Sequence, residues 1–221
     1  FYGRDFQAEN IRYTCSGMLF DVVIGDNIYP DLQIPLLGEH QAKNCALALA
    51  VCMDVMADLY RESDAPDIFS ETMCNQIRRQ LSAIHHPGRM EILSPDPFVL
   101  LDACIHSASC ENVKEVLRHL GISNCTVIVG IPEDKDYAGV VRSMKDVAAR
   151  IILTRSGNPH YHFSKHQREN PALEGIAAEW TDSVQQALTL AGSCPDPIVI
   201  LGTTSVISEV ERIFSNLNLP S

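Results

Sequence analysis

Residues 85–107, HHPGRMEILSPDPFVLLDACIHS, set the architecture of this chain. A Pro-Gly pair forms a turn that presents Arg89, and the apolar run Phe98–Leu101 then ends at Asp102. Arginine is suited to bidentate phosphate contact because its guanidinium is planar and permanently charged. Open α/β sheets bind ligands outside the carboxyl ends of their strands. The stretch therefore predicts a turn and a strand end that both contribute to a ligand site.

After the Pro-Gly turn, short apolar strands alternate with helical segments. Strands that are separated by helices imply right-handed crossovers and a mostly parallel sheet. We therefore expect a Rossmann-like α/β domain in which residues 155–175 form an irregular connection. The expected strands are 90–93, 98–101, 126–129, 151–153 and 198–201, and the expected helices are 109–120, 137–145, 182–190 and 205–214.

Before the turn, the pattern is that of a small antiparallel meander followed by helices. Alternating side chains and a Gly-Asp-Asn turn predict strands at 11–15, 19–24 and 28–34. An alanine-rich helical spacing follows at 40–61, and Ser70 is expected to cap a second helix that ends near residue 81. The Pro-Gly pair is the predicted domain boundary, which gives domains 1–87 and 88–221.

Composition excludes several classes of function. The 221 residues carry a formal net charge of -11, so phosphate-rich surfaces would repel the chain, and we expect no nucleic-acid or membrane partner. No apolar run is long enough to span a bilayer. The first residues lack both the apolar segment of a signal peptide and a start methionine, so we expect a part of a longer protein.

Cysteine and histidine spacing does not predict a metal site. The eight cysteines form no C-x-x-C pair, so we expect buried free thiols in a reducing cytoplasm. Histidines 160, 162 and 166 do not have zinc-ligand spacing and are expected to be solvated loop residues.

A second stretch, LLGEHQAKNCALA at residues 36–48, precedes the HPGRME turn in a fixed order. Together the two stretches resemble the Mur ligase superfamily and, within it, the folylpolyglutamate synthase / dihydrofolate synthase family. The resemblance implies that residues 1–87 are the end of the central ATPase domain. It implies that residues 88–221 are the C-terminal domain, which binds the incoming amino acid.

The resemblance also assigns roles to three residues at an ATP site. It implies that Asn44 contacts the nucleotide base, that Arg89 reaches ATP, and that Asp102 accepts hydrogen bonds from the ribose or adenosine. Each also has a simpler explanation from the sequence alone. Asn44 would be a solvent-facing or backbone-bonded helix residue, Arg89 a surface arginine, and Asp102 a carboxylate that caps a turn.

One stretch departs from the family pattern. The family reads D-G-A-H-N-P after this strand, whereas residues 102–107 read DACIHS. Ile105 takes the position of the histidine that lies near the phosphates, and an isoleucine cannot form a hydrogen bond. His106 is the candidate replacement. Further along, Lys135 and Arg155 are candidate contacts for a substrate carboxylate, with exposed loop residues as the alternative.

The chain contains no G-x-x-x-x-G-K-[ST] phosphate-binding loop. We therefore expect the phosphates of ATP and most Mg²⁺ ligands to be held by a P-loop domain upstream, and the chain alone to be catalytically inert. The resemblance implies an ATP-dependent ligase that adds L-glutamate to a folate through an acyl phosphate. The alternatives are a UDP-muramoyl-peptide amino-acid ligase, a degenerate nucleotide-binding member, and a stand-alone interaction domain.

Overall fold

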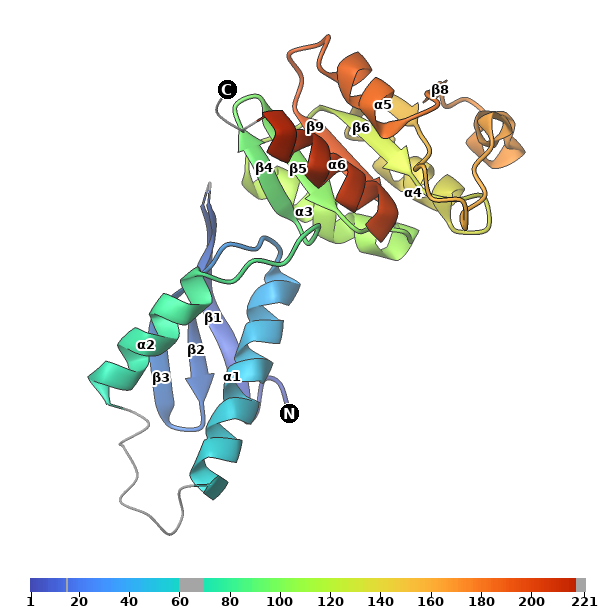
Figure 1. Ribbon diagram of the computed structural model, residues 1–221. Coiled ribbons are helices and arrows are strands. Elements are labelled where there is room, and N and C mark those ends of the chain that lie inside the picture. Colours follow the sequence, from blue (N-terminus) through green and yellow to red (C-terminus); the bar gives the residue numbers. More distant parts are fainter. Residues whose placement is uncertain (15, 60–69, 218–221) are drawn as a thin grey trace. The chain divides into compact units, whose positions relative to one another are not determined.

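The computed structural model describes residues 1–14, 16–59 and 70–217. The chain divides into two compact units, Phe1–His86 and Pro87–Ser221 (Figure 1). Cys15 and residues 60–61, which belong to a predicted strand and a predicted helix, lie outside the described residues. Within the described ranges, no helix is long and apolar enough to cross a membrane.

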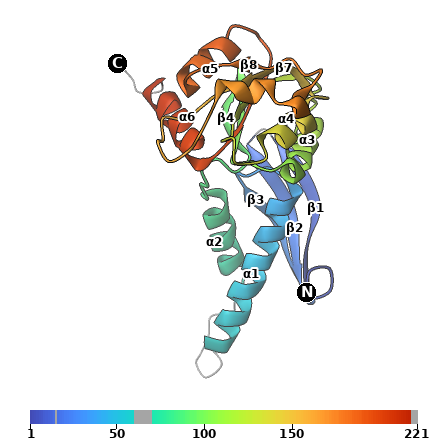
Figure 2. The same cartoon turned by 90° about the vertical axis from the view of Figure 1, so that its right-hand side faces the viewer.

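The first unit is a three-stranded antiparallel sheet with two helices packed on it, which confirms the predicted meander. Alternation along the central strand buries Met18, Phe20 and Val22. One helix, α1, packs on the first two strands and the other, α2, packs on the third (Figure 2). In chain order the elements are β1 (Phe6–Thr14), β2 (Gly17–Ile24), β3 (Asn27–Ile34), α1 (Glu39–Leu59) and α2 (Glu71–Ser82).

Helix α1 has apolar side chains on two faces and buries one of them. Leu47, Val51 and Val55, each four residues from the next, remain about half exposed. On a helix these positions lie opposite the buried residues. The buried residues of α1 are Ala42, Ala46, Leu49 and Met53.

The structure corrects one strand boundary in this unit and confirms one cap. β1 begins at Phe6 rather than at residue 11. The segment FQAEN pairs with β2, but it is largely polar and shows no clear apolar alternation, so its sequence did not indicate a strand. An irregular register between Glu9 and Arg12 interrupts that pairing. The Ser70 side chain accepts a hydrogen bond from the Met73 amide and so caps α2, as predicted.

The second unit contains a six-stranded sheet in the order β4-β5-β9-β6-β7-β8. β4 and β5 are antiparallel and the other neighbouring strands are parallel, which confirms the mostly parallel α/β sheet. The strands are β4 (Glu91–Pro95), β5 (Phe98–Asp102), β6 (Cys125–Gly130), β7 (Ala148–Leu153), β8 (Glu179–Trp180) and β9 (Ile198–Gly202).

Helices cover both faces of this sheet (Figure 2). On one face α5 and α6 pack against each other and against alternate strand side chains such as Leu101, Ile128 and Ile200. The neighbouring side chains along each strand point to the other face, where α3 and α4 pack together. The helices are α3 (Cys110–His119), α4 (Tyr137–Met144), α5 (Val184–Ala191) and α6 (Thr204–Leu217).

Two features of this unit differ from the sequence-based expectation. β8 is a two-residue strand that was not predicted, because Glu179 and Trp180 give no periodic signal. The helix expected from residue 109 begins at Cys110 after a 3₁₀ turn at Ser107–Ser109. The remaining strands and helices of the unit lie where they were predicted, within a few residues at each end.

Candidate functional site

The candidate site lies at one edge of the second sheet, where four parallel strands end. Asp102 of β5 is level with Leu201 of β9, and Gly130 of β6 is level with Gly202. β7 continues the same edge, since Val129 pairs with Leu153. Because parallel strands end together, the loops that follow them converge at this edge. Each candidate residue of the second unit lies at the end of one of these strands, in one of these loops, or in the turn before β4.

The Pro-Gly turn is fastened to the end of β5 by two hydrogen bonds. The Ala103 amide donates to the Gly88 carbonyl at 2.7 Å, and the Met90 amide donates to Asp102 Oδ2 at 2.9 Å. Gly88 has φ +64°, and a Cβ there would lie 2.5 Å from a methyl carbon of Ile207. The turn therefore requires glycine and holds Arg89 beside the strand end.

Asp102 is a buried carboxyl group with a perturbed pKa. Burial raises its pKa to about 6, while the hydrogen bond from the Met90 amide and the charge of Arg89 lower it. The Arg89 side chain itself is exposed. The structure thus brings together Arg89 and Asp102, two of the three residues predicted to contact ATP.

The loop after β5 is anchored by a residue that the sequence reasoning missed. The Ser107 amide and hydroxyl donate to Asp136 Oδ2 at 2.8 and 2.7 Å. Asp136 also caps α4, because its other oxygen accepts from the Gly139 amide. The Ser107 contacts hold the pKa of Asp136 below its usual value, and the charge of His106 adds to this effect. An aspartate three residues before the glycine of a helix start is a recognisable capping signal.

His106 and Ile105 occupy this anchored loop with different exposure. His106 is exposed and precedes the 3₁₀ turn, whereas Ile105 is half-buried. The hydrogen bonds that hold the loop are made by its neighbours. Its path therefore does not depend on a polar side chain at position 105.

The two residues proposed for a substrate carboxylate are exposed and already partnered. Lys135 forms an ion pair with Asp134 at 3.2 Å. Arg155 Nε donates to the Asp182 carbonyl at 3.0 Å. Both belong to loops at the carboxyl edge, Lys135 after β6 and Arg155 after β7.

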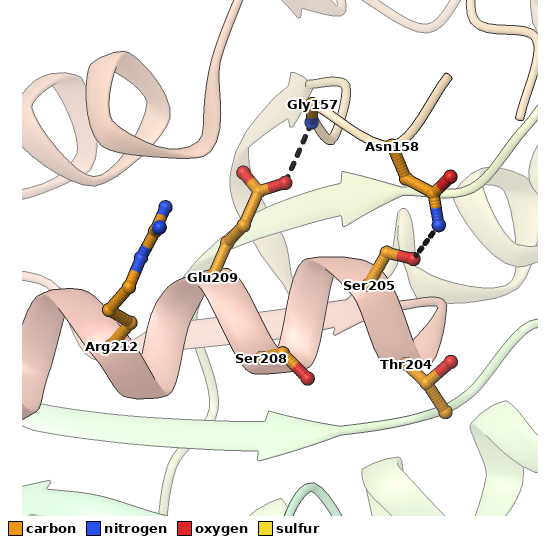
Figure 3. A pocket seen from close by; sticks show the side chains of 7 residues that line it. All are labelled: Gly157, Asn158, Thr204, Ser205, Ser208, Glu209 and Arg212. Atoms are coloured by element: carbon orange, nitrogen blue, oxygen red, sulfur yellow. Dashed lines mark hydrogen bonds between the residues drawn. The ribbon is translucent and has the colours of Figure 1, made fainter. Parts of the chain in front are cut away.

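An open cavity of about 580 Å³ lies between the loop after β7 and the start of α6. Glu209 and Ser205 reach from α6 to this loop (Figure 3). The Gly157 amide donates to Glu209 Oε1 at 2.7 Å, and Asn158 Nδ2 donates to Ser205 Oγ at 2.8 Å. The lining residues are Gly157, Asn158, Thr204, Ser205, Ser208, Glu209 and Arg212.

Two buried hydroxyl groups next to this cavity lack hydrogen-bond partners among the described residues. They are Ser156 Oγ and Thr203 Oγ1, and both side chains are more than nine-tenths buried. Each directly precedes a lining residue. Buried polar groups are normally paired, and although neither residue lines the cavity itself, each adjoins a residue that does. The polar run Gly-Thr-Thr-Ser after a buried strand was the signal in the sequence that could have found Thr203.

The cavity is suited to a ligand that carries both a negative and a positive charge. The amide groups at the start of α6 favour an anion, and Arg212 adds a positive charge. Glu209 supplies a negative charge within one helical turn. A carboxylate and an ammonium group on one molecule, as in an amino acid, match this arrangement. Within the described ranges, no group of three metal-binding side chains exists.

Asn44, the third residue predicted to contact ATP, belongs to the first unit. It lies in the second turn of α1, is exposed, and donates to Gln41 Oε1 at 3.4 Å. On the helix it shares the exposed face with Leu47 and Val51. Its amide is therefore accessible, and its contact with a base stays a prediction.

No family model matches the chain. It is 28% identical over 214 residues to the folylpolyglutamate synthase of Lacticaseibacillus casei, an alignment that covers 96% of this chain and 47% of that protein. It is 28% identical over 197 residues to a probable bifunctional folylpolyglutamate synthase/dihydropteroate synthase of Haloferax volcanii, covering 86% of this chain and 22% of that protein.

Among solved structures, the fold matches Mycobacterium tuberculosis folylpolyglutamate synthase complexed with ADP and AMPPCP. The TM-score is 0.77 at 20% identity, over 100% of this chain and 50% of that one. The chain thus spans half of the solved relative and less than half of the two others. The chain is similar to folylpolyglutamate synthases, and its extent is consistent with a C-terminal part of a Mur ligase superfamily protein.

Proposed function

We propose that this chain is part of an ATP-dependent ligase that joins L-glutamate to the carboxylate of a folate. The proposal rests mainly on Arg89 and Asp102, which the Pro-Gly turn holds together at the carboxyl end of β5. A guanidinium and a strand-end carboxylate suit the phosphates and the ribose hydroxyls of a nucleotide, respectively. The relatives named folylpolyglutamate synthase support the choice of reaction.

The cavity beside α6 is our proposed site for the incoming amino acid. The amides at the start of α6 would receive a carboxylate, and rotation of the adjacent Ser156 and Thr203 side chains would bring their unpartnered hydroxyls to it. Lys135 and Arg155 remain candidates for a second carboxylate, after exchange of their present partners. Glutamate carries two carboxylates and one ammonium group, which matches this set of charges.

In the proposed reaction, a folate carboxylate oxygen attacks the γ-phosphorus of ATP, and ADP leaves. The glutamate nitrogen then attacks the acyl carbon of the acyl phosphate, loses a proton, and expels inorganic phosphate. This chemistry requires a phosphate cradle and Mg²⁺. The described residues offer no cluster for a metal ion. Because the sequence contains no P-loop motif, we place the P-loop and most Mg²⁺ ligands outside these 221 residues and expect the chain alone to be inactive.

The test is glutamate incorporation by the full polypeptide that contains this chain. With ATP, Mg²⁺, labelled glutamate and a reduced folate, we expect labelled folate and one ADP for each glutamate added. Thr203→Val should raise the KM for glutamate and leave the KM for ATP unchanged. The matched Thr189→Val, on an exposed part of α5, should change neither.

Two results would reject the proposal. Turnover with a UDP-muramoyl peptide but with no folate would assign the chain to the peptidoglycan branch of the superfamily. Nucleotide binding without turnover of either acceptor would identify a non-catalytic member.

We also propose a cytoplasmic location, since the described cysteines are all free thiols.

A further inference from the structure

Two cysteine thiols meet beneath the loop that follows β5. The Sγ atoms of Cys104 and Cys110 lie 3.7 Å apart, and both are directed at the carbonyl of His106. Neither residue exposes more than 2% of its surface. They are six residues apart and enclose the loop between β5 and α3. The proposed function uses neither thiol.

The two sulfur atoms have different electrostatic surroundings. Cys110 is the first residue of α3, where the helix dipole favours a thiolate. The hydrogen bond from Cys104 lowers the pKa of Cys110, and Ser143 and the charge of Lys114 lower it further. Together they outweigh burial and the charge of Asp136, which raise it. The same hydrogen bond, with burial, raises the pKa of Cys104. Cys110 is therefore the stronger nucleophile of the pair, and Cys104 retains its proton.

The geometry places the pair one small movement away from a covalent bond. A disulfide requires an S–S separation of about 2.05 Å, so the two sulfur atoms must approach by about 1.7 Å from their present 3.7 Å. Side-chain rotation and a shift of the connecting loop can supply this movement. Cys104 follows β5 by two residues and Cys110 is the first residue of α3, so the connecting loop can take up the movement.

We propose that Cys104 and Cys110 form an oxidation-sensitive dithiol that a peroxide converts into an intramolecular disulfide. The Cys110 thiolate attacks one oxygen of hydrogen peroxide, which breaks the O–O bond and gives a sulfenic acid and hydroxide. The Cys104 sulfur then attacks the sulfenic sulfur, an S–S bond forms, and water leaves. In total, two thiols and one peroxide give one disulfide and two waters.

The segment between the two cysteines contacts both sulfur atoms through the His106 carbonyl, and we call it the cover. The cover is residues 105–109, in which His106 and Ala108 are exposed and Ile105 is half-buried. Its fixed point is Ser107, which donates twice to Asp136. Opening of this segment exposes the sulfur atoms to a small oxidant without unfolding the sheet. Loss of the Ser107 contacts should therefore speed up oxidation.

The pair can be followed within one peptide. Trypsin cleaves after Arg89 and Lys114, and peptide 90–114 contains Cys104 and Cys110 as its only cysteines. The purified chain is treated with hydrogen peroxide, denatured, blocked with N-ethylmaleimide and digested without reduction. We expect this peptide to lose both maleimide labels and two hydrogens, and to regain both labels after treatment with dithiothreitol.

Substitutions distinguish the roles of the two thiols. In Cys110→Ser, Cys104 should remain labelled, and in Cys104→Ser, dimedone should trap a sulfenic acid on Cys110. Cys125→Ser removes another buried thiol as the matched control and should leave the disulfide unchanged. Trp180 fluorescence verifies that each variant is folded, and the wild-type result does not depend on any variant.

The exposed Cys52 serves as the internal reference for oxidant dose. The proposal fails if peptide 90–114 keeps both labels at a dose that oxidises Cys52. It also fails if Cys110 proceeds to sulfinic acid while Cys104 stays labelled. Neither outcome depends on ligase activity, so the proposal is tested separately from the proposed function.

Discussion

Replacement of Asp102 by asparagine should stabilise the second unit at neutral pH. Burial raises the pKa of this carboxyl from 3.8 to about 6 in the folded chain. Below pH 3.8 the group is neutral in both the folded and the unfolded state and does not lower the free energy of unfolding. Between pH 3.8 and 6 the folded state keeps a proton that the unfolded state has lost, so stability falls as pH rises.

The expected size follows from this shift. A change of about 2 pKa units corresponds to about 3 kcal/mol of lost stability above pH 7, and the loss at pH 4.5 is only about 1 kcal/mol. Solvent screens the charge of Asp102 only weakly, because the residue is 7% exposed. Asparagine retains an oxygen that accepts from the Met90 amide and carries no charge. The stability advantage of Asp102→Asn should therefore grow by about 2 kcal/mol between pH 4.5 and 7.5.

Urea unfolding across this pH range measures the effect. Trp180 is the single tryptophan and belongs to the same unit as Asp102, so its fluorescence reports on the relevant part of the chain. The difference between wild type and variant removes the contributions of the other titrating groups. A stability difference that is constant with pH, or a variant less stable than wild type at pH 7.5, would refute the reasoning.

Three further changes test the turn and the loop around Asp102. Arg89→Ala should raise the KM for ATP of the full polypeptide by about tenfold or more. Its side chain is exposed, so stability should fall only through the loss of its charge beside Asp102; steady-state kinetics and urea unfolding check both parts. Gly88→Ala should destabilise the second unit by at least about 1–2 kcal/mol in urea, because alanine is strained at φ +64° and its Cβ would meet Ile207. Asp136→Ala should cost about 1–2 kcal/mol through loss of the α4 cap and should speed hydrogen exchange at the Ser107 amide. The stability from Asp136 is present above pH 3.8 and lost as pH falls through its lowered folded pKa, so unfolding of Asp136→Ala and wild type should converge in acid.

Local sequence signals predicted most of the second unit. Thr126–Val129 and Ile151–Leu153 are β-branched or aliphatic runs that only a buried strand explains, and both lie inside strands. Local signals failed where pairing is decided by distant residues. Glu179 and Trp180 form a strand only because β7 offers them an edge. The segment FQAEN extends β1 because β2 is long enough to pair with it.

The candidate site was predicted only in part, because some of its contacts also join residues that are distant in the sequence. Asp102 could be placed at a strand end from the sequence, because the strand and its termination are local. Its burial, which raises its pKa, and its bond to the Met90 amide, which lowers it, both depend on how the turn folds back onto the strand end. The predicted buried thiols were only partly correct, since Cys52 is exposed on α1. The capping signal of Asp136 and the polar run at Thr203 are local, but the contact of Asp136 with Ser107 and the place of Thr203 beside the cavity appear only when loops from separate strands meet.

Asp102 and Asp136 together explain how the loop after β5 tolerates isoleucine at position 105. Asp102 holds the Pro-Gly turn, whose Gly88 carbonyl accepts from Ala103 at the start of the loop. Asp136 holds the other end through Ser107. With both ends fixed by backbone and hydroxyl contacts, the side chain at 105 is not needed for the path of the loop. A change there alters the chemistry offered to a ligand and leaves the position of Arg89 and Asp102 unchanged. Ile105→His should therefore alter ATP kinetics in the full polypeptide with little effect on urea unfolding of the second unit.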